Sequence, residues 1–223
     1  MAEPANPDPY LSARRIMVEE QLRRRGIQDQ RVLAAMERVP RHEFIPRDSW
    51  DLAYRDQPVP IGEGQTISQP YVVAAMVQWL ALEPSDRVLE IGTGTGYEAA
   101  VLASLAAEVV TVERQPRLVE QAAENFRRLG YTNVRVAAGD GTLGVPEFAP
   151  YQAIVVAAAA PSTPPALIEQ LAEAGRMVLP VGSRDSQVLE LIRKVQGQSV
   201  SRPLAAVRFV PLLGEKGFSE RDF

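Results

Sequence analysis

The sequence predicts an α/β protein built on a doubly wound, mostly parallel β-sheet. Short apolar segments alternate with helical patterns between residues 87 and 182, the order expected when helices cover both faces of a parallel sheet. The segment 87–91 leads directly into three glycines at alternate positions, and the next apolar segment, 109–113, ends on an acidic residue. A strand, a glycine turn, a helix and a second strand with an acidic end are typical of nucleotide-binding sheets.

The composition limits the classes of protein that this chain can belong to. It has 223 residues, of which 46% are hydrophobic, enough for one domain with a full core. The net charge of -4 argues against a nucleic-acid surface, and the lack of cysteine excludes disulfides and thiolate sites. The start of the chain does not resemble a signal peptide, and no apolar stretch approaches 18 residues. We expect a soluble, cytoplasmic monomer that binds neither nucleic acid nor membrane.

The N-terminal third predicts helices that precede the sheet. Residues 1–9 are proline-rich and are expected to be frayed. Ser12 is a suitable N-cap for a helix that runs to Arg25 and ends at Gly26, and Asp29 is a suitable N-cap for a helix over 32–39.

Three arginines and one histidine in this region invite functional interpretations. Arg23, Arg24 and Arg25 are interpreted as a solvated last helical turn, which the helix dipole favours. His42 is the only histidine in the chain, and we assign it no catalytic role.

The segment 58–70 combines prolines, glycines and polar residues, and predicts a shaped loop before an apolar helix over 71–82. Ser68 is interpreted, on the capping preference alone, as the N-cap of this helix, because Pro70 suits the first helical turn.

The core and the C-terminal part follow in regular order. Strands are expected at 87–91, 109–113, 134–138, 151–156, 175–179, 187–195 and 205–213. Helices are expected at 97–106, at 116–129 with Gly130 as C-cap, and from Pro164 or Pro165 to 171. We expect a single domain over 1–223, with a flexible start (1–11), N-terminal helices and loop (12–82), an α/β core (83–182) and C-terminal antiparallel strands with a tail (183–223).

The glycine turn predicts a nucleotide ligand. Gly92, Gly94 and Gly96 depart from the dinucleotide pattern G-x-G-x-x-G, and no P-loop motif is present. Glu90 stands two residues before the first glycine, and Glu113 lies at the distance where an acidic residue accepts hydrogen bonds from ribose hydroxyls. The position of Glu113 alone does not distinguish an adenosyl ligand from NAD. The segment 92–96 could also be a tight turn without a ligand, but the strand before it, the helix after it and Glu113 make this the weaker interpretation.

The pattern E-x-G-x-G-x-G resembles the first motif of the class I S-adenosylmethionine methyltransferases, which have a Rossmann-like sheet. The chain from about residue 12 to 213 is similar to the protein-L-isoaspartate O-methyltransferase family. The matching segments are 17–22, 39–44, 60–70, 88–97, 139–141, 157–161, 179–182 and 207–212. The segment 65–70 (Gln-Thr-Ile-Ser-Gln-Pro) is far more specific to this family than the glycine motif.

The resemblance implies an enzyme that transfers a methyl group from S-adenosylmethionine to the free α-carboxylate of L-isoaspartyl residues in damaged proteins and peptides. Whether D-aspartyl residues are accepted is left open. It implies no metal. It implies cofactor contacts for Thr66, Ile67, Ser68, Glu90, Gly92, Gly94, Gly96, Glu113, Asp140 and Gly141. It implies substrate contacts for Thr66, Ser68, Phe209 and Val210, with Ser68 as the active-site serine.

The implied chemistry agrees with the residues present. A carboxylate nucleophile is already ionised at neutral pH and needs no general base, and a sulfonium donor activates its own methyl group. We therefore expect Ser68 to orient the substrate carboxylate as well as to cap the helix. An extended peptide is expected to lie against an apolar edge strand over 205–212.

Three other functions remain open from the sequence. They are methyl transfer to a different acceptor, binding without catalysis, and NAD-dependent oxidoreduction. The segment 65–70 and the N-terminal helices disfavour the first, the intact acidic residues disfavour the second, and the glycine spacing disfavours the third.

Overall fold

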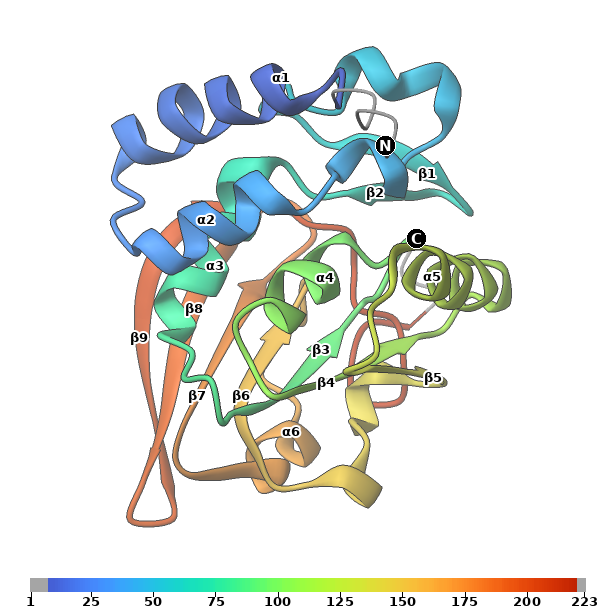
Figure 1. Ribbon diagram of the computed structural model, residues 1–223. Coiled ribbons are helices and arrows are strands. Elements are labelled where there is room, and N and C mark those ends of the chain that lie inside the picture. The colour runs from blue at the N-terminus through green and yellow to red at the C-terminus, as the bar shows by residue number, and fades with distance from the viewer. Residues whose placement is uncertain (1–7, 220–223) are drawn as a thin grey trace.

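The computed structural model describes residues 8–219 and confirms the predicted fold class (Figure 1). A seven-stranded sheet has the order β5-β4-β3-β6-β7-β8-β9. Strands β3 to β7 pair in parallel, whereas β8 and β9 continue the sheet antiparallel. Residues 1–7 of the start expected to be flexible lie outside the described residues. No helix within 8–219 is long and apolar enough to cross a membrane.

The N-terminal helices form a layer beside the sheet (Figure 1). A continuous helical stretch comprises α1 (Leu11–Ile16), the π-helical η1 (Met17–Leu22) and the 3₁₀ turn η2 (Arg23–Arg25), and it ends at Gly26 with a φ of +97°. Ser12 was expected to be the N-cap of this helix. The helix begins at Leu11, with Tyr10 in the N-cap position, so Ser12 lies inside it. Asp29 does cap α2 (Gln30–Arg38) by accepting a hydrogen bond from the Arg31 N–H.

His42 belongs to the short 3₁₀ turn η3 (Arg41–Phe44), which is followed by η4 (Arg47–Leu52). Its side chain is buried, with Nδ1 2.6 Å from the hydroxyl oxygen of Tyr54 and the ring against Tyr10. Burial lowers the pKa of His42. The only histidine therefore packs within the N-terminal layer, in agreement with the absence of an assigned role.

The loop expected over 58–70 contains a small hairpin of β1 (Val59–Gly62) and β2 (Gln65–Ile67). The helix that follows, α3, spans Pro70–Leu80. Its N-cap residue is Gln69, and no side chain caps the helix start. Ser68 is therefore not the N-cap that its sequence context suggests.

Most core elements match the expected ranges to within one residue, but the strand expected at 175–179 is longer and spans Leu171–Gly182. The strands are β3 (Arg87–Ile91), β4 (Glu108–Glu113), β5 (Val134–Ala138), β6 (Tyr151–Val156), β7 (Leu171–Gly182) and β8 (Gln187–Val195). The helices are α4 (Tyr97–Ala103), α5 (Pro116–Leu129) and α6 (Pro165–Gln170), with the 3₁₀ turns η5 (Gly141–Leu143) and η6 (Pro146–Phe148). The helix α4 ends three residues before the expected position.

The last strand differs from the expectation. Strand β9 spans Gln198–Val207, so it begins seven residues before the expected 205–213 and ends six residues before. Its first half is polar and exposed because it forms one edge of the sheet, so it carries no apolar pattern. Beyond Val207 the chain leaves the sheet, and Pro211 makes an isolated bridge with Ala159.

Alternate residues of the central strands pack on opposite faces. On one face, Val88 and Val109 pack in a cluster that includes residues of α3, α4 and α5. On the other face, Leu89 and Val110 pack in a cluster that includes Leu167 of α6. This alternation places the side chain of every second β3 residue beneath α4.

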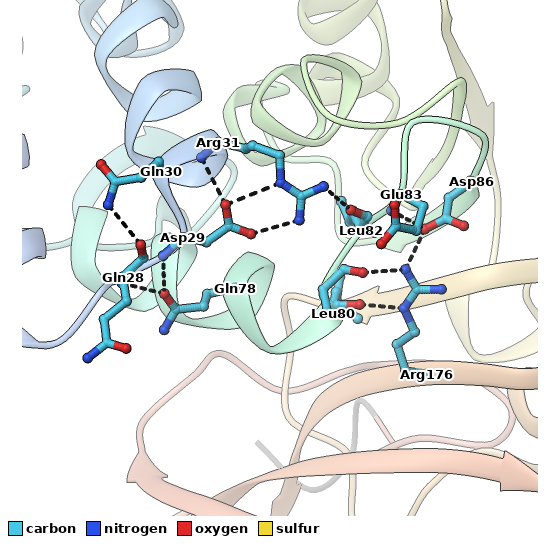
Figure 2. Close-up of polar contacts among 11 residues, drawn as sticks. Gln28, Asp29, Gln30, Arg31, Gln78, Leu80, Leu82, Glu83, Asp86 and Arg176 are labelled. Atoms are coloured by element: carbon cyan, nitrogen blue, oxygen red, sulfur yellow. Dashed lines mark hydrogen bonds and ion pairs between the residues drawn. The ribbon is translucent and has the colours of Figure 1, made fainter.

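Polar contacts fasten the N-terminal layer to the sheet through α3 (Figure 2). The Gln78 Oε1 accepts hydrogen bonds from the backbone N–H groups of Gln28 and Asp29. At the end of α3, Arg176 of β7 donates to the carbonyl oxygen of Leu80 and forms an ion pair with Asp86. These contacts hold α3 in position beside β7, the strand that carries Arg176.

Candidate active site

The glycine turn lies between β3 and α4, at the carboxyl end of the parallel strands. Gly92, Gly94 and Gly96 have φ angles of +95°, +54° and +99°, a region that side chains rarely adopt. A Cβ on Gly96 would lie 2.5 Å from Cζ of Phe126 on α5. The third glycine therefore lets the start of α4 pack against α5, whereas the first two expose backbone to a cavity.

A cavity that is partly open to solvent lies above this turn. Its walls come from the β1–β2 hairpin, the glycine turn, the ends of β4 and β6, and the segment after β9. Of the residues expected at the site, those that line this cavity are Thr66, Ile67, Ser68, Gly92, Gly94, Glu113, Gly141 and Val210.

Glu113 is held rigidly at the end of β4. One carboxylate oxygen accepts the Gly94 N–H at 2.9 Å, and the other accepts the N–H groups of Arg114 and Gln115 at 2.9 and 3.0 Å. The side chain is buried apart from its surface on the cavity. A carboxylate oxygen can accept two hydrogen bonds, so Glu113 retains capacity for one further donor on the oxygen that Gly94 binds.

The structure does not bring Glu90 to the cavity wall. Because Glu90 lies two residues from Val88 on β3, its side chain points beneath α4, where it is fully buried. The Thr111 hydroxyl donates to Oε2, and Oε1 has no partner among the described residues. Burial first, and then the nearby Glu98 carboxyl group, which disfavours a second negative charge beside it, raise the pKa of Glu90 well above its ordinary value.

Asp140 does not line the cavity, unlike its neighbour Gly141. Its Oδ1 accepts hydrogen bonds from the N–H and hydroxyl of Thr142, and its Oδ2 accepts the Glu215 N–H at 2.7 Å. Burial opposes ionisation, but these hydrogen bonds outweigh it and lower the pKa of Asp140. Asp140 therefore fastens the C-terminal segment beside the site. Gly96, similarly, lies behind the turn and is not part of the wall.

A second cavity meets the first at the segment before α3. It lies between α3 and β9 and is lined by apolar and aromatic side chains such as Tyr71, Trp79 and Phe209. The residues that line both cavities are Thr66, Ser68, Ala157 and Val210. All four residues that were expected to contact the substrate line the second cavity. Three of them also line the first cavity, whereas Phe209 lines only the second.

Sequence reasoning missed several wall residues. The most notable is Glu98, in the first turn of α4, which lines the first cavity. Its place directly after the glycine turn was a usable signal, because the motif fixes how the helix begins. Within residues 8–219, no three His, Asp or Glu side chains gather as a metal site.

Known proteins are similar in sequence to almost the whole chain. The sequence model of the protein-L-isoaspartate(D-aspartate) O-methyltransferase family matches residues 13–217. A protein-L-isoaspartate O-methyltransferase of Methanoculleus marisnigri is 54% identical over 211 residues, which cover 95% of this chain and 96% of the relative. A protein-L-isoaspartate O-methyltransferase 2 of Marinobacter nauticus is 55% identical over 207 residues, covering 92% and 94%.

Solved structures with related descriptions have a similar fold. A protein-L-isoaspartate O-methyltransferase superposes with a TM-score of 0.82 at 33% identity, covering 92% of this chain and 67% of that one. A Plasmodium falciparum protein of the same description, crystallised with S-adenosyl-L-homocysteine, superposes with a TM-score of 0.80 at 30% identity, covering 90% and 98%. On the family match and these identities, the chain belongs to the protein-L-isoaspartate(D-aspartate) O-methyltransferase family.

Proposed function

We propose that this chain transfers a methyl group from S-adenosylmethionine to the free α-carboxylate of L-isoaspartyl residues in damaged proteins and peptides. The observation that carries the proposal is the meeting of two cavities at Thr66, Ser68, Ala157 and Val210. The first cavity is lined by the glycine turn and the acidic end of β4, as in a nucleotide site. The second is lined by apolar and aromatic side chains beside the edge strand β9, which suits a peptide. A methyl donor and a carboxylate acceptor must approach each other at such a junction.

The residues of the first cavity fit S-adenosylmethionine. The turn presents backbone rather than side chains to the cavity, and a Cβ on Gly94 would lie only 3.1 Å from Cδ1 of Ile61 on the opposite wall. Glu113 keeps acceptor capacity for a ribose hydroxyl, and Ile91 and Val112 give the cavity an apolar part. When bound, the donor supplies an electrophilic methyl group on a positively charged sulfur. The relative from Plasmodium falciparum, crystallised with S-adenosyl-L-homocysteine, supports this assignment.

The protein's own contribution is to position the acceptor and to exclude water. The α-carboxylate of an isoaspartyl residue has a pKa of about 3.5 to 4 and is ionised at neutral pH, so no residue needs to remove a proton. The Ser68 hydroxyl is not used as a helix cap and is available to donate a hydrogen bond to that carboxylate. Correct alignment of a nucleophile can supply an effective molarity of roughly 10⁵ M or more.

The second cavity suits an extended peptide. Strand β9 forms the edge of the sheet, and residues 205–210 line the cavity beside it. A peptide that binds along this edge can be recognised through its backbone. Such recognition agrees with a repair enzyme whose substrates share a displaced carboxylate and differ in their neighbouring side chains.

The proposal is tested with a pair of peptides that differ only in an isoaspartyl or an aspartyl residue. We expect methyl transfer to the isoaspartyl peptide alone. Ser68→Ala should lower kcat/KM about 10- to 100-fold, because a hydrogen bond to a charged group contributes about 1.5–3 kcal/mol. Ser12→Ala, at an exposed position of α1, is the matched control and should leave kcat/KM unchanged.

Two of the three alternative functions predict the same result in this assay, and binding of NAD in a thermal-shift measurement would indicate the third, NAD-dependent oxidoreduction. Donor binding without transfer to either peptide would favour a binding module or a methyltransferase with another acceptor. Full turnover by Ser68→Ala would remove the role proposed for its hydroxyl. The cytoplasmic location, the monomeric state and the lack of nucleic-acid binding stay part of the proposal. Cell fractionation, size-exclusion chromatography and a nucleic-acid binding assay test them.

A further inference from the structure

Glu98 is a buried carboxyl group on the wall of the donor cavity, and one of its oxygens has no partner within the described part of the chain. It lies in the first turn of α4, two residues after Gly96, and is 7% exposed. Its Oε1 has no hydrogen-bond partner among residues 8–219. Buried polar atoms in native proteins are almost always paired. Because Glu98 lines the cavity, a bound ligand is the partner that its buried Oε1 can reach through a small movement of the side chain.

The two acids of the cavity wall differ in what they can still bind. Three backbone N–H groups already satisfy most of Glu113, so it suits a neutral donor such as a hydroxyl. Glu98 receives no such support at Oε1. An acceptor without partners in a buried site suits a cationic group that brings several N–H donors.

The electrostatic surroundings keep Glu98 protonated while it has no partner. Burial raises its pKa to about 8. The charged groups of the same wall are Glu113 and Arg114 at the end of β4, and Glu90 of β3 lies behind it. Tyr97, the residue before it, directs its hydroxyl away toward Sδ of Met36.

We infer that Glu98 binds the α-ammonium group of the methyl donor and becomes ionised as the donor binds. The inference rests on the proposed function. The donor carries two cationic groups, the ammonium and the sulfonium, and only the ammonium has N–H bonds to donate. The proton balance is simple, since Glu98 releases its proton to solvent and the ammonium keeps all of its own. The product S-adenosylhomocysteine has the same ammonium, so it should be held by the same contact.

Isothermal titration calorimetry with S-adenosylhomocysteine tests the inference without any turnover. Titrations at pH 7 in phosphate and in Tris buffer report the protons released on binding, because the two buffers differ in their ionisation enthalpies. For the unaltered protein we expect release of close to one proton per ligand. Glu98→Gln should bind at least tenfold more weakly and release no proton. Glu120→Gln, the same change on the exposed surface of α5, should behave like the unaltered protein.

Two further ligands identify the group that Glu98 holds. 5′-Methylthioadenosine lacks the amino-acid part, so Glu98→Gln should leave its affinity unchanged. S-adenosylmethionine and S-adenosylhomocysteine should lose affinity by the same factor. A loss confined to S-adenosylmethionine would place Glu98 at the sulfonium and overturn the assignment to the ammonium.

The remaining outcomes separate this inference from the proposed function. If the unaltered protein does not bind S-adenosylhomocysteine, the proposed function and the inference both fail. If it binds and Glu98→Gln binds equally well, or releases the same proton, only the inference fails. Folding is not a confounding factor, because an amide of the same shape removes the cost of a buried carboxyl, and the melting temperature of Glu98→Gln should not fall.

Discussion

Replacing Gly96 by alanine tests the structural explanation of the third glycine. Gly96 has a φ of +99°, and its missing Cβ would lie 2.5 Å from Cζ and 2.8 Å from Cε1 of Phe126. Phe126 is a buried residue of α5. Its ring cannot move aside without disturbing the packing of α4 and α5 on the sheet, so the substitution adds a steric clash to the backbone strain.

The expected loss of stability has two parts. A left-handed backbone costs a residue with a Cβ about 1–2 kcal/mol, and an added group in a packed core costs about 1–3 kcal/mol. Gly96→Ala should therefore lower the free energy of unfolding by about 2–5 kcal/mol. Gly130, the C-cap of α5, is a matched control, because its φ is +78° but no atom lies within 4 Å of its missing Cβ. Gly130→Ala should lose only the strain of about 1–2 kcal/mol.

Urea unfolding followed by circular dichroism measures both variants against the unaltered protein. The double variant Gly96→Ala/Phe126→Leu should be more stable than the sum of the single effects predicts, because the smaller side chain relieves the clash. Equal losses for Gly96→Ala and Gly130→Ala, or strictly additive effects in the double variant, would refute the explanation by close packing.

Two further predictions concern stability. Asp86→Ala should lower the free energy of unfolding by about 3–5 kcal/mol, because it leaves the nearly buried Arg176 without its charged partner. A loss below about 1 kcal/mol in urea unfolding, as for exposed ion pairs, would contradict this. The second concerns pH. Since the pKa of Glu98 is raised by burial from 4.5 to about 8, the folded state holds more protons than the unfolded state between these values. Stability therefore falls as pH rises across this window. The free energy of unfolding of Glu98→Gln, relative to that of the unaltered protein, should therefore be higher at pH 8 than at pH 5. An equal difference between the two proteins at both pH values would disprove this prediction.

The site residues show where sequence reasoning reached its limit. Gly92, Gly94, Glu113 and the segment 66–68 lie on the cavity wall, because short-range patterns determine a turn and the end of a strand. Their contacts with the cofactor stay a prediction. Glu90 and Asp140 were expected beside the cofactor, yet each side chain contacts other parts of the protein. Their roles at the site remain a prediction to be tested by binding measurements.

The sequence by itself determined the elements whose boundaries depend on local backbone chemistry. Pro116 begins α5 and Gly130 ends it, Asp29 caps α2, and the central strands occupy the expected apolar segments. Glycine, proline and capping residues act on their immediate neighbours, so their effects can be predicted without knowledge of the fold.

Only the tertiary structure decided which way the polar side chains point. Ser68 is free of the helix start because Gln69 takes the N-cap position, and Asp140 binds a segment 75 residues away in the sequence. Glu98 reaches the cavity, whereas Glu90 is buried behind it. The physical reason is that a buried polar group must find its partner among groups that packing brings together, and most of these are distant in the sequence.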